Sequence, residues 1–401
     1  MQGLFVYFFI FCAAFLELNT INCAPTSSFT TFDVTKFGAR GDGKTDDTTA
    51  FHTAWASACS ERLGNPKVIV PSERAFLVSS IRFDGPCKSD SITFEILGSI
   101  VAHPREAWGG GDAHEWLYFY QIEGLCVEGN GLGLIDGKGD SWWKIGNENS
   151  RPTAMRFSQC NKLRISGLKH KDSQRNHISI NSCHNATISN LHITTPATSP
   201  NTDGIDINSS SNLLIQDCVM ETGDDCIAIN GGNSDVNISR ITCGPGHGIS
   251  IGSLGKDGQH DEVKGIHVDN CTFIRTQNGA RIKTWQGGLG FAKNIIFSNI
   301  IFISADHPVV IDQYYCPHQK CDDKASAVEV SDVKYIGLRG TSVRNNGTIN
   351  LSCSKTVPCT GIVIDGLDIK GVDGSQTSAR CINAHGTIPH LSNPAVDCLL
   401  P

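Results

Sequence analysis

Four short phrases of the sequence bring together carboxylate, imidazole and cationic side chains. They are Asn201-Thr-Asp203, Gly223-Asp-Asp225, Gly246-His-Gly248 and Arg281-Ile-Lys283. Crowded carboxylates cannot all ionise easily, so one can stay protonated as an acid while another is ionised as a base. Glycoside hydrolysis needs such a pair. For a single aspartate, a ladder of stacked polar residues or a calcium site would be the simpler interpretation. Neither explains as well why carboxylate, imidazole and cationic side chains occur together in the four phrases.

The place of these residues in a repeated run predicts that they meet. Six four-residue runs carry apolar residues at their second and fourth positions, which the period of a strand turns into a core. The residues just before the runs are Asn176, Asp203, Asp225, His247, Asn278 and His307. Because neighbouring parallel strands lie about 4.8 Å apart, we expect Asp203, Asp225 and His247 to stack on successive coils. Arg281 and Lys283 should face the same surface.

A second repeated phrase predicts the architecture. An eight-residue run of β-type residues recurs at intervals of about 22 to 38 residues. Its copies begin at Asn161, His184, Ser211, Ser234, Lys264, Lys293, Ser331 and Thr360. Such a period with variable insertions is typical of stacked coils. We therefore predict an all-β, right-handed parallel β-helix, with handedness taken from the general preference of parallel crossovers. An antiparallel sandwich is the alternative.

One helix is predicted near the start of this solenoid. Thr45-Asp46-Asp47 precedes a stretch with Ala50, Phe51, Ala54, Trp55 and Ala58 on one face, which is typical of a capped amphipathic helix. The first coil of a solenoid would otherwise expose its core, so we assign this helix as an N-terminal cap.

The composition limits which cellular compartment and which binding partners the protein can have. The 401 residues carry a net charge of −7 without a basic patch, which argues against a nucleic-acid partner. Residues 3–16 form an apolar run of signal-peptide length, so residues 1–24 are predicted to be a secretory signal and residues 25–401 one catalytic domain. A membrane anchor is the alternative, but the run is shorter than the roughly 20 residues of a span. We expect an extracellular, monomeric protein of the cell wall.

The cysteines agree with secretion. Seventeen cysteines suit an oxidising compartment, and fifteen remain after residues 1–24, so at least one has no partner within the chain. Four close pairs could close short loops: Cys226/Cys243, Cys316/Cys321, Cys353/Cys359 and Cys381/Cys398. No spacing fits a zinc site. Six sequons, at Asn185, Asn208, Asn237, Asn270, Asn346 and Asn350, would be available for N-glycosylation.

The four phrases, in this order and at these spacings, closely resemble the signature motifs of the polygalacturonases, the family 28 glycoside hydrolases. The similarity extends over nearly the whole predicted mature chain, from Phe32-Asp-Val-Thr-Lys-Phe-Gly-Ala to Ile311-Asp-Gln-Tyr-Tyr-Cys316. The resemblance implies a right-handed parallel β-helix that hydrolyses α-1,4 linkages between galacturonic acid residues of pectin. It implies inversion at the anomeric carbon and no metal or other cofactor.

The resemblance also implies roles for individual residues. Asp224 would be the general acid, Asp203 and Asp225 would together activate water, and His247 would tune the acid. Arg281 and Lys283 would hold a substrate carboxylate, a contact for which a guanidinium fork is well suited. Tyr315 matches a substrate-binding tyrosine, although Tyr314 is adjacent, and Asn201 is assigned to the same role. We expect Lys169, His170, Lys171, Arg175 and His177 to extend a basic cleft or to form a solvated turn.

Several functions remain open from the sequence. Endo action is slightly favoured over exo action, and hydrolases of rhamnogalacturonan or xylogalacturonan would share the acids. A pectate lyase would share the solenoid but use calcium and an arginine base. A catalytically silent wall-binding solenoid is the alternative outside enzymes. If the chain is a hydrolase, its activity should be greatest at mildly acidic pH, where the acid keeps its proton.

Overall fold

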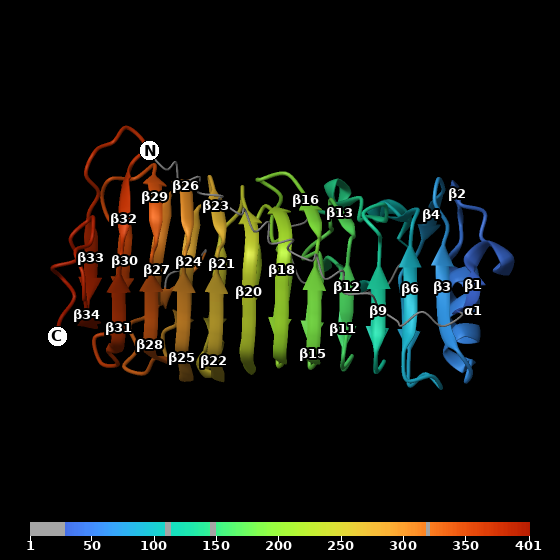
Figure 1. The fold of residues 1–401 in the computed structure, drawn as a ribbon, viewed down its shortest axis with the longest axis horizontal. Coiled ribbons are helices and arrows are strands. Elements are labelled where there is room, and N and C mark those ends of the chain that lie inside the picture. The colour runs from blue at the N-terminus through green and yellow to red at the C-terminus, as the bar shows by residue number, and fades with distance from the viewer. Residues whose placement is uncertain (1–28, 109–113, 145–149, 318–320) are drawn as a thin grey trace, which may run out of the picture.

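The chain winds into a stack of coils along one axis. The computed structural model describes residues 29–108, 114–144, 150–317 and 321–401. Successive strands follow one another from the N-terminal end to the C-terminal end of the long axis (Figure 1). All pairings between named strands are parallel. The predicted right-handed parallel β-helix is therefore confirmed.

Two sheets make up the walls of the stack. Sheet B is 11-stranded and contains one strand from each coil in chain order. Its strands are β5 (Ile81–Asp84), β8 (Glu115–Tyr120), β11 (Thr153–Ser158), β14 (Ile178–Asn181), β17 (Ile205–Asn208), β19 (Ile227–Ile229), β21 (Ile249–Leu254), β24 (Asn278–Trp285), β27 (His307–Tyr315), β30 (Ile349–Ser352) and β33 (Ala379–Ile382).

Sheet A has 23 strands and supplies the rest of each coil. Its strands are β1 (Phe29–Asp33), β2 (Asp42–Asp46), β3 (Asn65–Val70), β4 (Ala75–Val78), β6 (Ile92–Ile96), β7 (Ser99–Ala102), β9 (Leu125–Glu128), β10 (Leu134–Asp136), β12 (Arg164–Ser166), β13 (Lys169–Lys171), β15 (His184–Ser189), β16 (His192–Thr194), β18 (Ser211–Glu221), β20 (Asn233–Cys243), β22 (His260–Asp269), β23 (Thr272–Ile274), β25 (Leu289–Ser298), β26 (Ile301–Ala305), β28 (Glu329–Ile336), β29 (Arg339–Ser342), β31 (Cys359–Asp365), β32 (Asp368–Gly371) and β34 (Ala384–Thr387).

The alternating pattern of the sequence forms the core. In β14, Ile178 and Ile180 are fully buried, while Ser179 and Asn181 face outward. The register continues this pattern, because Ile178 pairs with Ile205, and Ile205 pairs with Ile227 on the next coil. Each outward residue of sheet B consequently stands beside the outward residue of the neighbouring coil.

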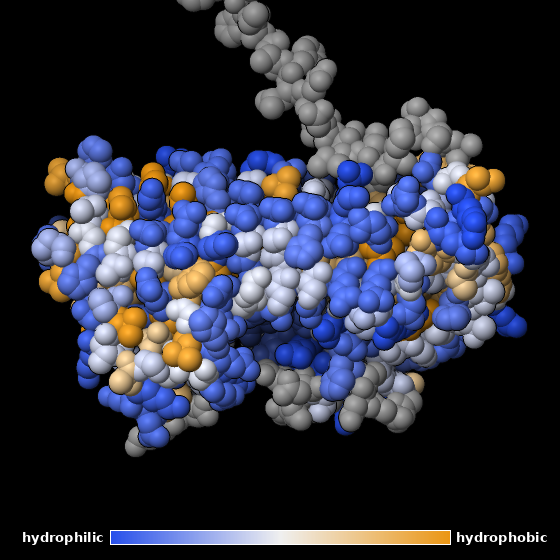
Figure 2. All heavy atoms as spheres, turned by 90° about the horizontal axis from the view of Figure 1, so that it is seen from below, coloured by the Kyte–Doolittle hydropathy of each residue, from blue (hydrophilic) through white to orange (hydrophobic). Residues whose placement is uncertain are grey.

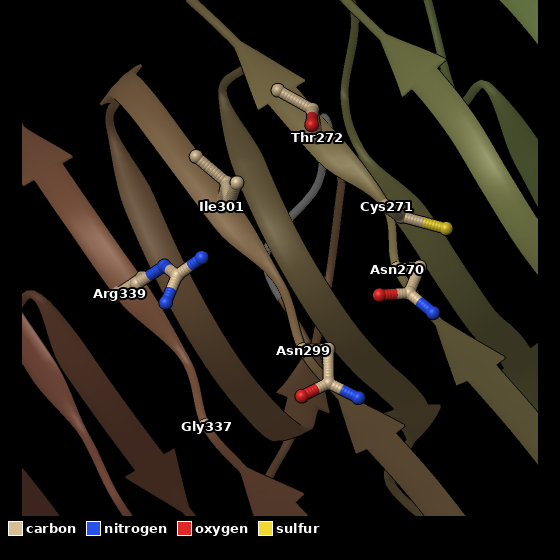
Figure 3. A pocket seen from close by; sticks show the side chains of 7 residues that line it. All are labelled: Asn270, Cys271, Thr272, Asn299, Ile301, Gly337 and Arg339. Atoms are coloured by element: carbon tan, nitrogen blue, oxygen red, sulfur yellow. The ribbon is translucent and has the colours of Figure 1, made fainter. Parts of the chain in front are cut away.

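The eight-residue phrase marks a turn in sheet A. Its seventh residue has a positive φ, the left-handed conformation, in all eight copies. These residues are Gly167, Asn190, Asp217, Arg240, Asn270, Asn299, Gly337 and Gly366. Glycine, asparagine and aspartate tolerate this conformation best. Asn270, Asn299 and Gly337 of this row line a small surface cavity with Arg339 (Figure 3).

Helix α1 (Thr48–Ser60) covers the N-terminal end of the core, as predicted. Phe51 and Trp55 are buried, and the Trp55 indole donates to the Asp84 carbonyl oxygen at 3.0 Å. The hydrogen bonds at the N-terminus of α1 differ from those of a simple side-chain cap. Asp47 occupies the N-cap position, but its carboxylate accepts from the backbone of Arg40 and Gly41, while Asp46 accepts from the Thr48 amide.

The four predicted short-range cysteine pairs are all disulfides. A fifth disulfide, Cys59–Cys87, ties the end of α1 to the loop after β5. Four further cysteines, Cys160, Cys183, Cys218 and Cys271, are free and buried. No helix among the residues described is long and apolar enough to span a membrane. The predicted signal sequence, residues 1–24, lies outside the described residues.

Candidate active site

The residues that precede the strands of sheet B stack as the repeat predicted. The amide of Gly204 donates to the Asp225 carbonyl oxygen at 2.9 Å, and the Cys226 amide donates to the Gly248 carbonyl oxygen at 2.8 Å. These bonds place Asp203, Asp225 and His247 on consecutive coils. Gly248 has φ +95°, and a Cβ there would lie 2.4 Å from the Asn278 carbonyl oxygen, so the turn after His247 requires glycine.

Asp225 is the centre of a buried ion cluster. Its Oδ1 accepts from Arg281 Nη2 at 2.5 Å, and its Oδ2 accepts from Lys283 Nζ at 2.7 Å. Ser250 completes the cluster, since its hydroxyl donates to Asp225 Oδ1 at 2.9 Å and accepts from Arg281 Nε at 2.8 Å. The Asp225 side chain is fully buried. Burial alone would raise the pKa of Asp225, but Arg281 and Lys283 outweigh it and lower the pKa to about 2.

Asp224 lies beside Asp225 and remains partly accessible. Its Oδ1 contacts Nδ1 of His247 at 2.9 Å and accepts from the Asp225 amide at 2.9 Å. The side chains of Asp224 and His247 are 21% and 34% exposed. A carboxyl that is partly exposed beside an imidazole can exchange a proton with a ligand, which Asp225 cannot do as easily.

Asp203 and Asp206 supply two more carboxyls on the neighbouring coil. Burial and the charge of Asp224 raise the pKa of Asp203 well above its usual value. Burial also raises the pKa of Asp206 to about 7, against the opposing charge of Arg175. Asp225 is therefore ionised at a pH at which Asp203 still holds a proton.

Tyr315 lies beside the cluster and Tyr314 does not. Lys283 Nζ is 5.4 Å from the centre of the Tyr315 ring, which packs edge-on against Trp285. The Tyr314 hydroxyl instead accepts from the Lys355 amide at 3.1 Å. The geometry thus separates the two adjacent tyrosines that the sequence left ambiguous.

Asn201 and Asn176 support the turns that carry the carboxylates. Asn201 has φ +55°, and its Oδ1 accepts from Arg151 Nη2 at 2.6 Å. Asn176 donates to Asp206 Oδ2 at 2.9 Å and accepts from the Thr153 hydroxyl at 2.6 Å. His307 lies 3.8 Å from Asp306, two coils beyond His247. Asn176 and His307 therefore each lie beside an aspartate.

Two residues of the expected basic cleft are placed elsewhere. His170 and His177 are each 1% exposed and face each other inside the coil, with ring centres 6.0 Å apart. The prediction that they extend a cleft is wrong, because the strand that carries His170 turns it into the core, in line with Ile193. Lys169 and Lys171 are exposed, and Arg175 is partly exposed.

Sequence reasoning missed Ser250 and Asp206. Both occupy the third, outward position of a repeated run, in Gly248-Ile-Ser-Ile251 and Gly204-Ile-Asp-Ile207. The same register that stacked the aspartates would have placed these side chains on the adjacent row of the outer face. A polar residue at an outward position was the available signal.

A metal could in principle use Asp224, Asp225 and His247, whose ligand atoms lie within 4.8 Å of one another. Asp225, however, already accepts from two cationic groups and a hydroxyl. A divalent ion there would have to displace Arg281 or Lys283 or be repelled by them. The donor set fits a proton-transfer site better than a cation site.

The surface is hollowed near the middle of the long axis, where hydrophilic residues line the depression (Figure 2). Acids, an imidazole and cations in register along one sheet of an elongated molecule fit a β-helical enzyme that hydrolyses glycosidic bonds.

Comparison with known proteins agrees with this class. The family model described as "Glycosyl hydrolases family 28" matches residues 59–393. A probable polygalacturonase of Arabidopsis thaliana is 45% identical, over 98% of this chain and 84% of its own length. A polygalacturonase of Persea americana is 42% identical, over 92% and 80%. The chain therefore belongs to glycosyl hydrolase family 28 and is a glycoside hydrolase.

Solved structures share the fold. The endo-xylogalacturonan hydrolase of Aspergillus tubingensis has a TM-score of 0.77 at 24% identity, covering 91% of this chain and all of its own. A polygalacturonase of Erwinia carotovora has a TM-score of 0.73 at 20% identity, covering 92% and 98%. At these identities the likeness concerns the β-helix alone.

Proposed function

We propose that the protein is a secreted polygalacturonase that hydrolyses α-1,4-galacturonosyl linkages of pectin with inversion and without a metal. The observation that carries the proposal is the convergence of Asp203, Asp224 and Asp225 with Arg281 and Lys283 on one sheet. The relatives described as polygalacturonases, at 42% and 45% identity, support the substrate class. The apolar run at residues 3–16 and the five disulfides among the described residues support secretion.

In this proposal, Asp224 donates a proton to the glycosidic oxygen, and His247 beside it adjusts the protonation of the acid. Water attacks the anomeric carbon from the opposite face, and Asp203 and Asp225 together activate it, with Asp225 as the ionised carboxylate that takes its proton. Asp225 stays ionised and holds Arg281 and Lys283 in place. These cations bind the substrate carboxylate, with Tyr315 beside Lys283, and Asn201 is a further substrate contact. The lowered pKa of Asp225 keeps one carboxylate of the site ionised to activate the water.

The decisive experiment compares the wild-type protein with Asp224→Asn on de-esterified polygalacturonate in the presence of a chelator. We expect new reducing ends without UV absorbance, and a fall in kcat/KM of about 10²- to 10⁴-fold in the variant, the usual worth of a general acid. Asp332→Asn, an exposed residue of sheet A, is the matched control and should leave the rate unchanged.

Other outcomes would redirect the proposal. UV-absorbing products that appear only when calcium replaces the chelator would indicate a lyase. The absence of products under both conditions would indicate another pectic backbone or a binding role. The rate of viscosity loss separates the two modes of attack. We expect rapid loss, because the slight preference from the Arg281 to Gly288 stretch is for endo action.

A further inference from the structure

Two free cysteines lie side by side on neighbouring coils. Ser158 of β11 pairs in register with Asn181 of β14, and the Gln159 amide donates to the Asn181 carbonyl oxygen at 3.0 Å. Cys160 and Cys183 each follow two residues after this pair. The Cys160 amide donates to Sγ of Cys183 at 3.3 Å, so the register continues to the two cysteines. Both side chains are fully buried.

The spacing of these two cysteines suits a disulfide. Residues in register on neighbouring parallel strands lie about 4.8 Å apart, and disulfides join Cα atoms that are about 4.4 to 6.8 Å apart. The thiol of Cys160 is hydrogen-bonded to the sulfur of Cys183. This hydrogen bond lowers the pKa of Cys183, and together with burial it raises the pKa of Cys160. Cys183 is therefore the thiol of the pair that ionises first.

The other two free cysteines of the described residues, Cys218 and Cys271, are too far apart for such a bond. Cys218 pairs in register with Ile241, and the next residue, Thr242, pairs with Thr272. Cys271 therefore lies beyond Ile241, two coils and about 9.6 Å from Cys218. A disulfide does not bridge Cα atoms more than about 7 Å apart. The chain thus contains a close pair and a distant pair of buried free cysteines.

A purely structural role for the sulfur atoms is the alternative. Cys183 belongs to an inward row in which each side chain accepts the backbone amide of the coil before it. The Cys183 amide donates to the Ser210 hydroxyl at 3.0 Å, and the Ser210 amide donates to Asn233 Oδ1 at 2.9 Å. A hydroxyl and an amide serve as acceptors further along the row, and sulfur is a weaker acceptor than either. The row alone therefore gives no reason for two adjacent cysteines.

We propose that Cys160 and Cys183 are a disulfide-forming pair that cross-links two coils of the β-helix. The bond forms while the chain folds in an oxidising compartment, before the coils exclude solvent. The Cys183 thiolate attacks a low-molecular-weight disulfide, such as oxidised glutathione, and releases one thiol. The Cys160 thiolate then attacks Sγ of Cys183 in the mixed disulfide and releases the second thiol. Two electrons pass to the small disulfide, and the two cysteine protons leave with the released thiols.

The cross-link fixes the coil that precedes the catalytic aspartates. It closes a segment of 23 residues that contains Asn176, which donates to Asp206 Oδ2 at 2.9 Å. The inference needs only an oxidising compartment, which the five disulfides among the described residues also need. It does not depend on the reaction that the site catalyses, so it can fail while the proposed function stands.

The test maps the cysteines of the wild-type protein after secretion from a eukaryotic host. The protein is unfolded in N-ethylmaleimide without a reductant, digested, and analysed by mass spectrometry. We expect the peptides of Cys160 and Cys183 to be joined, and lighter by two hydrogen atoms than the sum of the two thiol peptides. Cys218 and Cys271 should both carry the label. Labelled Cys160 and Cys183, or either one joined to a different cysteine, would overturn the proposal.

Cys183→Ser tests what the cross-link contributes, because Ser210 shows that serine fits the row. Cys160 should become labelled in this variant. Its midpoint of thermal unfolding should be several degrees below that of the wild type, since the 23-residue loop is no longer closed in the unfolded chain. Cys218→Ser is the matched control: it also replaces a buried thiol by a hydroxyl, but it should keep Cys160 joined to Cys183 and lower the midpoint less. Equal losses in the two variants would overturn the stabilising cross-link.

Discussion

Ser250 shows how one hydroxyl can control the ionisation of a neighbouring carboxyl. It is buried and bonds to both Asp225 and Arg281. Removing a hydrogen bond to a charged group costs about 1.5 to 3 kcal/mol, which corresponds to roughly one to two pKa units. Ser250→Ala should therefore raise the pKa of Asp225 from about 2 into the range of an ordinary aspartate.

The measurement is the pH profile of kcat/KM. Activity depends on ionised Asp225, so a raised pKa moves the acidic limb of the profile to higher pH. Ser331→Ala, a buried serine of sheet A, should leave the limb in place. A Ser250→Ala profile with an unmoved limb and a uniformly lower rate would mean that the hydroxyl only supports packing.

The spatial position of a site residue was predictable from the sequence wherever the repeat fixed the coil on which its side chain lies. The repeat placed Asp203, Asp225 and His247 on neighbouring coils without any structural information. The partners of Arg281 and Lys283 were not predictable in the same way, because only the folded chain shows that both reach back to Asp225. The sequence also did not predict whether a side chain near a turn points into the core or out to solvent, as the buried side chain of His177 shows.

At the scale of elements, one position of the repeated phrase marks the turn between strands, a regularity that the pattern of apolar residues did not predict. The seventh residue of the repeated phrase is left-handed in every copy, and Arg240 is the one copy that is neither glycine, asparagine nor aspartate. Its guanidinium makes two bonds to Asp217 of the preceding coil, at 2.6 and 2.9 Å. Six of the eleven strands of sheet B, β14 to β27, were predictable to within a few residues, because their period-2 pattern repeats from coil to coil.

The Cys226–Cys243 disulfide joins the residue after Asp225 to the end of β20, across 17 residues. In the loop-closure model, a crosslink of that length contributes about 3 kcal/mol, and the six-residue Cys353–Cys359 loop about 2 kcal/mol. Replacing both cysteines of the first pair by alanine should therefore lower the midpoint of thermal unfolding more than the same change in the second pair. Equal midpoints for the two double variants would contradict a chain-entropy origin.

At the scale of the whole molecule, stacking explains why a chain of 401 residues needs only a narrow core. Each coil buries its apolar row against the coils on either side, so the molecule grows in length and not in width (Figure 1). The sequence predicted this shape from one repeat and one capping helix. It could not predict which polar side chains would be enclosed, because burial in a solenoid depends on the neighbouring coils.

His170 and His177 are the enclosed polar pair with the clearest consequence for the whole molecule. Burial lowers the pKa of His170 to about 3 and that of His177 well below its usual value. Their four ring nitrogens have no hydrogen-bond partner among the described residues. In the unfolded chain both imidazoles would bind protons below about pH 6.5, whereas in the folded chain they stay neutral to much lower pH.

Folding should therefore become less favourable as pH falls below about 6.5, by up to about 1.4 kcal/mol per pH unit for each histidine. We expect His170→Met, which suits the position beside Ile193, to make the midpoint of thermal unfolding fall less steeply between neutral pH and about pH 4.5. His260→Gln, whose side chain is 60% exposed in the wild-type protein, should keep the wild-type slope. Because aspartates titrate equally in all three proteins, the difference between slopes isolates the imidazole. Parallel slopes for wild type and His170→Met would show that the buried pair takes up protons in the folded state.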